Sequence, residues 1–447
     1  MLQTIEIPIW LFVVILLFAT VTFASHFLFP SVRWFFRRRL EKAVARLNTR
    51  LTRPIEPFKL ARRHDMIQRL IYDPEVTHAI VEHAAEQSIP ENVAFEEAQR
   101  YAREIVPSFS AFAYFGFAIR AARWLANLLY DVRTPPENDR VFEPISSDTT
   151  VVFVMNHRSN MDYVLVTYLA ARSSALSYAV GEWARVWPLS RLIKSMGAYF
   201  IRRKSRNALY RKVLARYVHM ATAGGVTQAV FPEGGLSLDG HLMPPKMGIL
   251  AYIVDAWEPD GRDVAFVPVA INYDRVLEDR VLIAAGLRGD RRFGAKVSVI
   301  FKFIRQKLWL KLRGRFTRFG AAAVVFGEPV LLSSYRAKPD PADLAADLMA
   351  RIGGHMPILG VPLLCNVLLA ADAPMTLEAA ISAAKTRLSE SGKAGPLRED
   401  VAHMLAQALE HMKQRHFVLS DGDNLQVNPE ERSTVAYYAN SVAHHFE

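Results

Sequence analysis

The sequence predicts an α/β fold in which a mixed β-sheet is flanked by helices. Short apolar segments alternate with helical patterns through the middle of the chain, as is typical of a sheet covered by helices on both faces. Amphipathic helical patterns continue on either side, and a charge-free apolar segment lies near the start. We therefore expect a transmembrane anchor in residues 1–32, an N-terminal helical region in 33–138, an α/β domain in 139–335 and a C-terminal helical region in 336–447.

The charge balance of the 447 residues favours an anionic partner. The formal net charge is +11 at pH 7, and 51% of the residues are hydrophobic. Such a balance is typical of proteins that bind nucleic acid, an anionic membrane surface or a phosphorylated substrate. Cys365 is the one cysteine, which excludes disulfides within the chain and cysteine-based zinc sites. The sequence predicts no metal site.

Residues 8–29 are predicted to form a single transmembrane helix. They contain no Lys, Arg, Asp or Glu, and roughly twenty residues is the length that crosses a hydrocarbon core. A cleaved signal peptide is the alternative, but no Lys or Arg precedes the segment, whereas aromatic and basic residues follow it in 33–39. By the positive-inside rule, the anchor crosses the inner (cell) membrane once and the rest of the chain is cytoplasmic. This placement favours anionic membrane lipid as a partner and disfavours nucleic acid.

The chain between the anchor and the α/β domain is predicted to be helical from residue 41 to 130. Residues 109–130 are rich in aromatic side chains, which we expect to pack on the core, with contact to lipid as the alternative. A loop in 134–139 ends this region. Basic residues cluster further on, in 202–216 and 288–318, where a solvated helix face and attraction to anionic lipid are both open.

The α/β domain is predicted from apolar segments of strand length separated by helical patterns. From residue 340 onward the pattern is helical again, with a loop in 420–424. The expected strands are residues 149–155, 175–180, 198–201, 227–231, 264–270 and 321–326.

A polar segment, Asn-His-Arg-Ser-Asn-Met-Asp in residues 156–162, follows the first of these strands. Ser159 and Asp162 have the spacing of a capping box, so Asp162 can be explained as a helix cap. His157 has no such explanation, because it lies at the carboxyl end of a strand, where open α/β sheets place ligands. Its ring can fold back onto the Asp162 carboxylate, which would fix the tautomer and leave the other ring nitrogen to accept a proton. The segment predicts either a helix cap or a general base.

Polar side chains follow two further strands of the predicted sheet. Residues 197–203 deliver Arg202 and Arg203, and residues 231–235 deliver Glu233 before a glycine turn. Lys246 comes shortly afterwards, in front of a predicted helix. If the strands are parallel neighbours, these side chains meet at one edge of the sheet. A base beside cations is suited to a phosphorylated alcohol, whose phosphate Arg and Lys would hold.

Four blocks in this order resemble those of the glycerolipid acyltransferases: NHRSNMD, GAYFIRR, FPEGG and VPVAIN (267–272). FGEP (326–329) and YYANSVAHHF (437–446) are similar to the membrane-bound glycerol-3-phosphate acyltransferases of the long bacterial and mitochondrial type. The resemblance implies the acyltransferase fold and transfer of a fatty acyl group from a thioester to the 1-hydroxyl of glycerol 3-phosphate in phospholipid synthesis. It implies acyl-CoA or acyl-carrier protein as the donor substrate, and no cofactor or metal.

The resemblance also implies roles for individual residues. His157 would take the hydroxyl proton and Asp162 would orient it. The residues implied in substrate binding are Arg158, Arg202, Arg203, Glu233, Gly234, Gly235 and Lys246. The chain departs from the family where Arg-Ser-Arg usually follows the glycine turn, because it has Leu236, Ser237 and Leu238. The acceptor is therefore either glycerol 3-phosphate or an already acylated lysolipid such as lysophosphatidate.

Two alternatives come from other classes of protein. Residues 234–240 nearly match the Gly-x-Ser-x-Gly motif of serine hydrolases, but Asp239 stands where the last glycine belongs. A membrane-anchored binding protein without catalytic activity is the other alternative, since one fold can host many functions. The presence of both His157 and Asp162 disfavours it.

Overall fold

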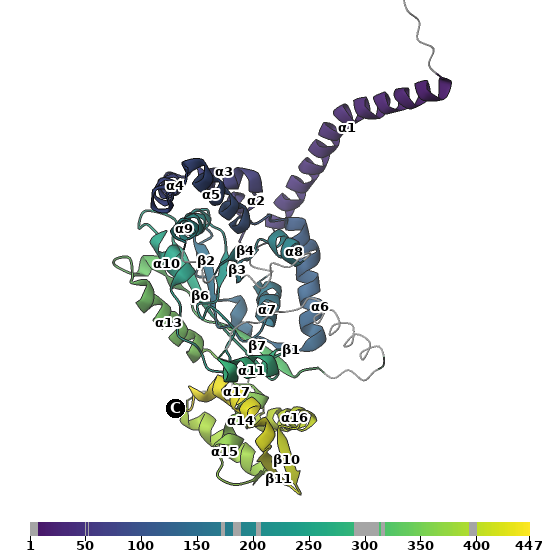
Figure 1. Cartoon of the computed structure of the whole chain (residues 1–447). Coiled ribbons are helices and arrows are strands. Elements are labelled where there is room, and N and C mark those ends of the chain that lie inside the picture. The colour runs from purple at the N-terminus through teal and green to yellow at the C-terminus, as the bar shows by residue number, and fades with distance from the viewer. Residues whose placement is uncertain are drawn as a thin grey trace, which may run out of the picture. The chain divides into compact units, whose positions relative to one another are not determined.

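The protein is described by a computed structural model covering residues 8–49, 51, 53–170, 175–181, 189–202, 207–289, 313, 318–392 and 400–447 (Figure 1). The chain divides into two compact units, Met1–Pro54 and Ile55–Glu447.

The first unit contains one long helix, α1 (Ile9–Asn48). In the part of the chain that the structure describes, no helix meets the length and apolarity needed to span a membrane. The predicted transmembrane anchor is therefore not supported. The side chains of residues 21–37, which include part of that predicted anchor, lie outside the described ones.

The second unit is built on a mixed sheet with the strand order β1-β7-β6-β2-β5-β3-β4, and β8 pairs with β6. Strand β2 lies between β5 and β6 and is parallel to both, whereas β7 runs antiparallel to β6. The predicted mixed α/β sheet is thus confirmed. The strands are β1 (Asp131–Arg133), β2 (Thr150–Met155), β3 (Ser177–Gly181), β4 (Tyr199–Ile201), β5 (Gln228–Val230), β6 (Val264–Tyr273), β7 (Ala321–Phe326) and β8 (Val330–Leu331).

All six predicted strands are present, with ends within three residues of the prediction. They were recognisable because central strands are buried on both faces and so read as continuous apolar runs. Every residue of β2 and β6 is buried. The short strands β1 and β8 were not predicted, and β1 carries two charged residues among its three.

Helices cover both faces of the sheet, as predicted (Figure 1). Side chains alternate along β2, so Val152 and Val154 pack with one layer while Val151 and Phe153 pack with the other. The first layer contains α3 (Arg63–Ile71), α4 (Pro74–Gln87), α5 (Glu91–Ile105), α9 (Ala208–Ala223), α10 (Gly248–Asp255) and α13 (Pro341–Gly354). The second contains α6 (Ile119–Leu129), α7 (Met161–Leu169), α11 (Asp279–Arg288), α14 (Gly360–Leu369), α16 (Val401–Gln414) and α17 (Arg432–Ala443).

Further helices complete these layers: α2 (Pro57–Leu60), η1 (Phe112–Ala118), η2 (Pro136–Asp139), α8 (Leu189–Ser195), η5 (Leu332–Ser334), α15 (Leu377–Glu390) and η6 (Pro429–Glu431). The aromatic segment 109–130 forms η1 and α6. It buries Tyr114 in the core as predicted, but Phe112, Phe117 and Trp124 are exposed.

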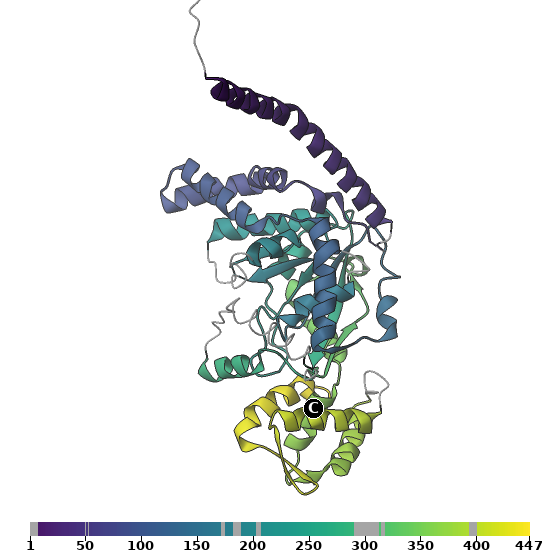
Figure 2. The same ribbon diagram turned by 90° about the vertical axis from the view of Figure 1, so that its right-hand side faces the viewer.

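The C-terminal region is helical, as predicted, and apart from α13 it gathers at one end of the sheet (Figure 2). It also contains a small antiparallel sheet that was not predicted: β9 (Met375–Thr376), β10 (Val418–Asp421) and β11 (Asn424–Val427). The predicted loop in 420–424 is the turn between β10 and β11, where Gly422 adopts a φ of +59°. Hydrogen bonds join the region to β6: Asn272 Nδ2 donates to the backbone oxygen of Pro357 at 2.9 Å.

Candidate active site

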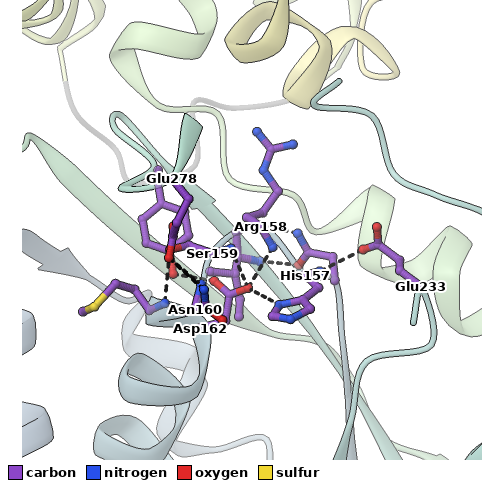
Figure 3. A network of polar contacts seen from close by, with 11 residues as sticks. His157, Arg158, Ser159, Asn160, Asp162, Glu233 and Glu278 are labelled. Carbon is purple, nitrogen blue, oxygen red and sulfur yellow. Dashed lines mark hydrogen bonds and ion pairs between the residues drawn. The ribbon is translucent and has the colours of Figure 1, made fainter. Parts of the chain in front are cut away.

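His157 and Asp162 form a buried pair beyond the carboxyl end of β2 (Figure 3). The strand ends at Met155, and α7 begins at Met161 with Asn160 as its N-cap, so His157 lies in the loop before the helix. The loop brings His157 Nδ1 to 2.9 Å from Asp162 Oδ2. His157 is 2% exposed and Asp162 is fully buried. The two side chains therefore interact with little competition from water.

Asp162 accepts hydrogen bonds from four groups. Its Oδ2 accepts the backbone N–H groups of Arg158 at 2.8 Å and Ser159 at 3.0 Å, in addition to the His157 ring. Its Oδ1 accepts the Tyr273 hydroxyl at 2.5 Å. The carboxylate thus both holds the loop before the helix, as a cap would, and contacts the ring of His157. The two explanations drawn from the sequence are compatible in one side chain.

Only half of the predicted capping box is formed. Asp162 accepts the Ser159 backbone N–H, but Ser159 Oγ accepts from Met161 N and donates to Glu278 Oε2 at 2.7 Å. Glu278 also accepts from Asn160 Nδ2 at 3.0 Å, and burial raises the pKa of its carboxyl. It lies 119 residues beyond Ser159, so no local pattern in the sequence indicated it.

The ring and backbone of His157 are held from several sides. Its ring stacks on Phe231 with the centroids 4.1 Å apart, and Tyr163 meets it edge-on at 5.5 Å. Its backbone N–H donates to Glu233 Oε1 at 2.8 Å, and its backbone oxygen accepts from Ser237 N at 3.0 Å. Among the described residues, none is hydrogen-bonded to Nε2. The pair is therefore arranged so that Nε2 can exchange a proton.

Glu233 follows β5 and uses both carboxyl oxygens on backbone groups. Besides the His157 N–H, it accepts the N–H of Met243 at 3.3 Å. Burial raises the pKa of Glu233 to about 8. Its side chain thus connects the loop of His157 (Figure 3) to the segment that follows the glycine turn.

Gly234 and Lys246 lie together after β5. Gly234 has a φ of +67°, and a Cβ at this position would approach Lys246 Cδ to 2.9 Å. Lys246 is exposed, and its backbone N–H donates to the oxygen of Pro232 at 2.8 Å. Glycine is needed here both for the backbone conformation and for the space that the lysine side chain occupies. Gly235, next in the turn, is partly buried.

Arg202, at the carboxyl end of β4, is paired with an acid of the N-terminal region. Its Nε and Nη2 donate to the two carboxylate oxygens of Glu104 in α5, at 3.0 and 2.7 Å. This hydrogen-bonded pairing raises the pKa of Arg202. The sequence did not indicate the pair, which joins residues 98 apart. Arg203 lies outside the described residues.

Arg158 points away from the ring of His157 in Figure 3. It is buried, its Nη1 donates to the backbone oxygen of Gly240, and its guanidinium lies 5.1 Å from the centroid of the Tyr437 ring. Its Nε and Nη2 have no hydrogen-bond partner among the described residues. Arg158 thus connects the catalytic loop to the C-terminal helix α17.

The segment after the glycine turn packs inward. Leu236 and Leu238 are partly buried against the core, and Leu238 contacts Gly286 of α11. Ser237 Oγ accepts from Gly240 N at 3.0 Å and donates to the backbone oxygen of His241 at 2.8 Å. Ser237 therefore stabilises this turn, and a serine-hydrolase nucleophile finds no support. Among the described residues, no cluster of His, Cys, Asp or Glu suited to a metal ion occurs.

Known families match two parts of the chain. Residues 138–272 match the family described as Acyltransferase, and residues 308–447 match the glycerol-3-phosphate acyltransferase C-terminal region. The chain therefore contains an acyltransferase domain and a glycerol-3-phosphate acyltransferase C-terminal region. The resemblance found in the four blocks is thereby confirmed.

Curated proteins similar to this chain bear the name glycerol-3-phosphate acyltransferase. One from Alteromonas mediterranea is 27% identical over 420 residues, covering 87% of this chain and 50% of the relative. One from Pseudomonas aeruginosa is 32% identical over 290 residues, covering 64% of this chain and 34% of the relative. The chain thus spans about half the length of the Alteromonas relative and about a third of the length of the Pseudomonas relative. A solved 1-acyl-sn-glycerophosphate acyltransferase from Thermotoga maritima covers 54% of this chain and 76% of its own at 21% identity, with a TM-score of 0.34, too low to carry an argument.

Proposed function

We propose that this acyltransferase moves a fatty acyl group from a thioester donor to the 1-hydroxyl of glycerol 3-phosphate in phospholipid synthesis. The donor is acyl-CoA or acyl-carrier protein. The observation that carries the proposal is the buried contact of 2.9 Å between His157 Nδ1 and Asp162 Oδ2. The names of the curated relatives support glycerol 3-phosphate as the acceptor.

In the proposed reaction, His157 acts as the general base. The Asp162 carboxylate acts only as a hydrogen-bond acceptor, so the ring nitrogen that faces it, Nδ1 of His157, must carry the proton. The lone pair of the ring is therefore on Nε2. As the acceptor hydroxyl attacks the thioester carbonyl, its proton passes to Nε2 and Asp162 stabilises the imidazolium. The C–S bond then breaks, and the thiolate leaves with the proton that His157 held. No cofactor takes part.

Lys246, Arg202 and Arg203 are the proposed phosphate-binding residues. Lys246 follows β5, the strand next to β2, and its side chain lies against Gly234. The bidentate contact with Glu104 engages Nε and Nη2 of Arg202, which leaves Nη1 for a phosphate oxygen. Replacing Lys246 by alanine should therefore raise the KM for glycerol 3-phosphate and leave the KM for the donor unchanged.

The proposal includes a place at the cytoplasmic face of the inner membrane, with anionic lipid as a partner. The charge-free segment 8–29 and the basic residues after it support this location. Protease treatment of sealed inner-membrane vesicles of known orientation tests it. Catalytic residues protected on the far side of the membrane would contradict both the location and a cytosolic donor.

Lysophosphatidate is the second candidate acceptor. Leu236 and Leu238 stand where the family usually has two arginines, and both are partly buried against the core. An apolar wall at this turn would suit an acceptor that is already acylated. The two leucines therefore favour a lysolipid acyltransferase as the alternative function.

Steady-state rates with purified protein separate these proposals. Release of free thiol from acyl-CoA is measured with glycerol 3-phosphate, with lysophosphatidate and with no acceptor, and His157→Ala serves as the inactive control. We expect turnover with glycerol 3-phosphate to exceed that with lysophosphatidate. The opposite preference establishes the lysolipid alternative. If neither acceptor is turned over, the protein is the non-catalytic binding protein that was the alternative from the sequence. If the turn faces the phosphate, Leu236→Arg lowers the KM for glycerol 3-phosphate.

A further inference from the structure

A basic hollow of about 560 Å³ lies at the edge of the sheet next to β4. Its lining comes from α5, α8 and Phe200 of β4. One acid, Glu104, lines it, and that carboxylate is already bound by Arg202. The basic residues of the lining are Arg100, Arg103, Arg191 and Lys194.

The two helices that form the hollow are tied to each other. Lys194 Nζ donates to the backbone oxygen of Arg103 at 3.1 Å, and its ammonium lies 5.6 Å from the centroid of the Phe200 ring. Lys194 contacts only the backbone of Arg103, whose guanidinium donates through Nη2 to Gln99 Oε1 at 2.5 Å, which leaves Nε and Nη1 for a ligand. Arg103 and Arg191 are both exposed at the hollow. A concave surface with several basic side chains is suited to a ligand that carries more than one phosphate.

The position of the hollow decides which substrate it suits. Strands β2, β5, β3 and β4 are adjacent and parallel, so their carboxyl ends lie at one edge of the sheet. Three strand spacings separate β2 from β4, which is about 14 Å. A ligand that reaches both His157 and the hollow must span at least this distance. Glycerol 3-phosphate carries a single phosphate, for which Lys246, Arg202 and Arg203 are already proposed, so the further cations of the hollow suit a second, longer ligand with more than one phosphate.

Acyl-CoA has the required form, because its pantetheine arm separates the thioester from a diphosphate and a 3′-phosphate. We propose that the basic hollow binds the nucleotide end of an acyl-CoA donor while the thioester lies at His157. This inference rests on the proposed function. The volume lies within the range of about 300–1,000 Å³ that is usual for small-molecule sites. The forked guanidinium groups of Arg103 and Arg191 contact the phosphates.

The test uses the full chain with Arg103→Ala, Arg191→Ala and the double variant. Both residues are exposed on helices, so alanine should preserve the fold. Each single change should weaken CoA binding, measured by calorimetry, and raise the KM for acyl-CoA roughly tenfold, with the KM for glycerol 3-phosphate unchanged. Lys413→Ala, which removes an exposed lysine from α16, is the matched control and should change neither constant.

A donor without the 3′-phosphate makes the test sharper. Wild-type protein should bind 3′-dephospho-CoA more weakly than CoA, and the double variant should bind the two almost equally. Unchanged CoA affinity in the double variant overturns the proposal, as does a rise in the KM for glycerol 3-phosphate alone. A loss confined to acyl-carrier protein as donor assigns the hollow to a protein carrier and also overturns it. Calorimetry with CoA needs no turnover, so failure of the proposed reaction is detected separately.

Discussion

Replacing Asp162 by asparagine removes a charge while keeping the shape of the side chain. Oδ2 accepts two backbone N–H groups, from Arg158 and Ser159, which cannot become acceptors. The asparagine oxygen must therefore take this position, with the amide nitrogen facing the Tyr273 hydroxyl, which can accept as well as donate. His157 keeps its tautomer and the loop keeps its hydrogen bonds. What is lost is the negative charge beside the developing imidazolium.

The expected loss can be worked out from the contact. With charge centres about 4 Å apart and an effective dielectric constant of about 20, the attraction between carboxylate and imidazolium is about 4 kcal/mol. The ion pair is buried, with a separation of 2.9 Å between Nδ1 and Oδ2, so little water screens it. A rise of about 4 kcal/mol in the barrier lowers kcat roughly 10³-fold.

The assay measures kcat for thiol release with saturating acceptor, together with thermal unfolding. Tyr273→Phe is the matched control, because it removes the donor to Oδ1 but leaves the charge of Asp162. It should cost roughly 10- to 150-fold in kcat, since a hydrogen bond to a charged group contributes about 1.5–3 kcal/mol. If Asp162→Asn keeps more than roughly a tenth of wild-type kcat, the charge is not needed, and the side chain serves only as a helix cap.

Three further predictions concern the surroundings of the pair. Burial raises the pKa of Glu233 from 4.5 to about 8, so its contribution to stability is complete below pH 4.5 and is lost as the pH rises through about 8. In urea titrations, the free energy of unfolding of wild type, relative to that of Glu233→Gln, should therefore decrease as the pH is raised from 4.5 to about 8. The same pH dependence of stability in both proteins would contradict this expectation. Tyr437 has a buried hydroxyl without a hydrogen-bond partner among the described residues, and its ring covers the Arg158 guanidinium. Tyr437→Phe should change stability by less than about 0.5 kcal/mol and Tyr437→Ala should lower it by about 3–5 kcal/mol, whereas equal losses in chemical denaturation would show that the hydroxyl matters. Gly234→Ala forces a Cβ into the left-handed region and against Lys246, so it should cost about 1–2 kcal/mol and raise the KM for glycerol 3-phosphate. An unchanged KM would place Lys246 away from the acceptor.

The sheet and the contact between His157 and Asp162 could be predicted because their signals are local. Central strands are buried on both faces, so they read as apolar runs that end in polar residues. His157 and Asp162 are five residues apart, and a loop before a helix is enough to join them. Strand β1 has two charged residues among its three, and the strands of the small C-terminal sheet are largely exposed, so neither forms an apolar run and neither was predicted.

The groups around the pair could not be predicted, because the topology of the sheet brings them together. Tyr273 contacts Asp162 across 111 residues of sequence, and Glu278 meets Ser159 across 119. Neither distance leaves a pattern in the chain. Arg202 illustrates the same limit, since a basic residue at a strand end predicts an anion but not that Glu104 is its partner. Arg158, grouped with substrate-binding residues by its position after His157, contacts Gly240 and Tyr437 for the same reason.

The pairing of β1 with β7 has a consequence for how the protein is made. Asn138, just after β1, donates to and accepts from the backbone of β7, and one of these contacts spans 188 residues. Ribosomes add roughly 5–20 residues per second, so β1 is synthesised roughly 10 to 40 s before its partner strand. Strand β6 ends at Tyr273 and β7 begins at Ala321, so for roughly 2 to 10 s β6 lacks its neighbour on one side, and its backbone donors and acceptors are open to other chains. The nascent chain therefore passes through a period in which the loop that holds His157 has been made but the sheet has an unprotected edge. Protection by a chaperone is most needed between the release of β6 and the release of β7.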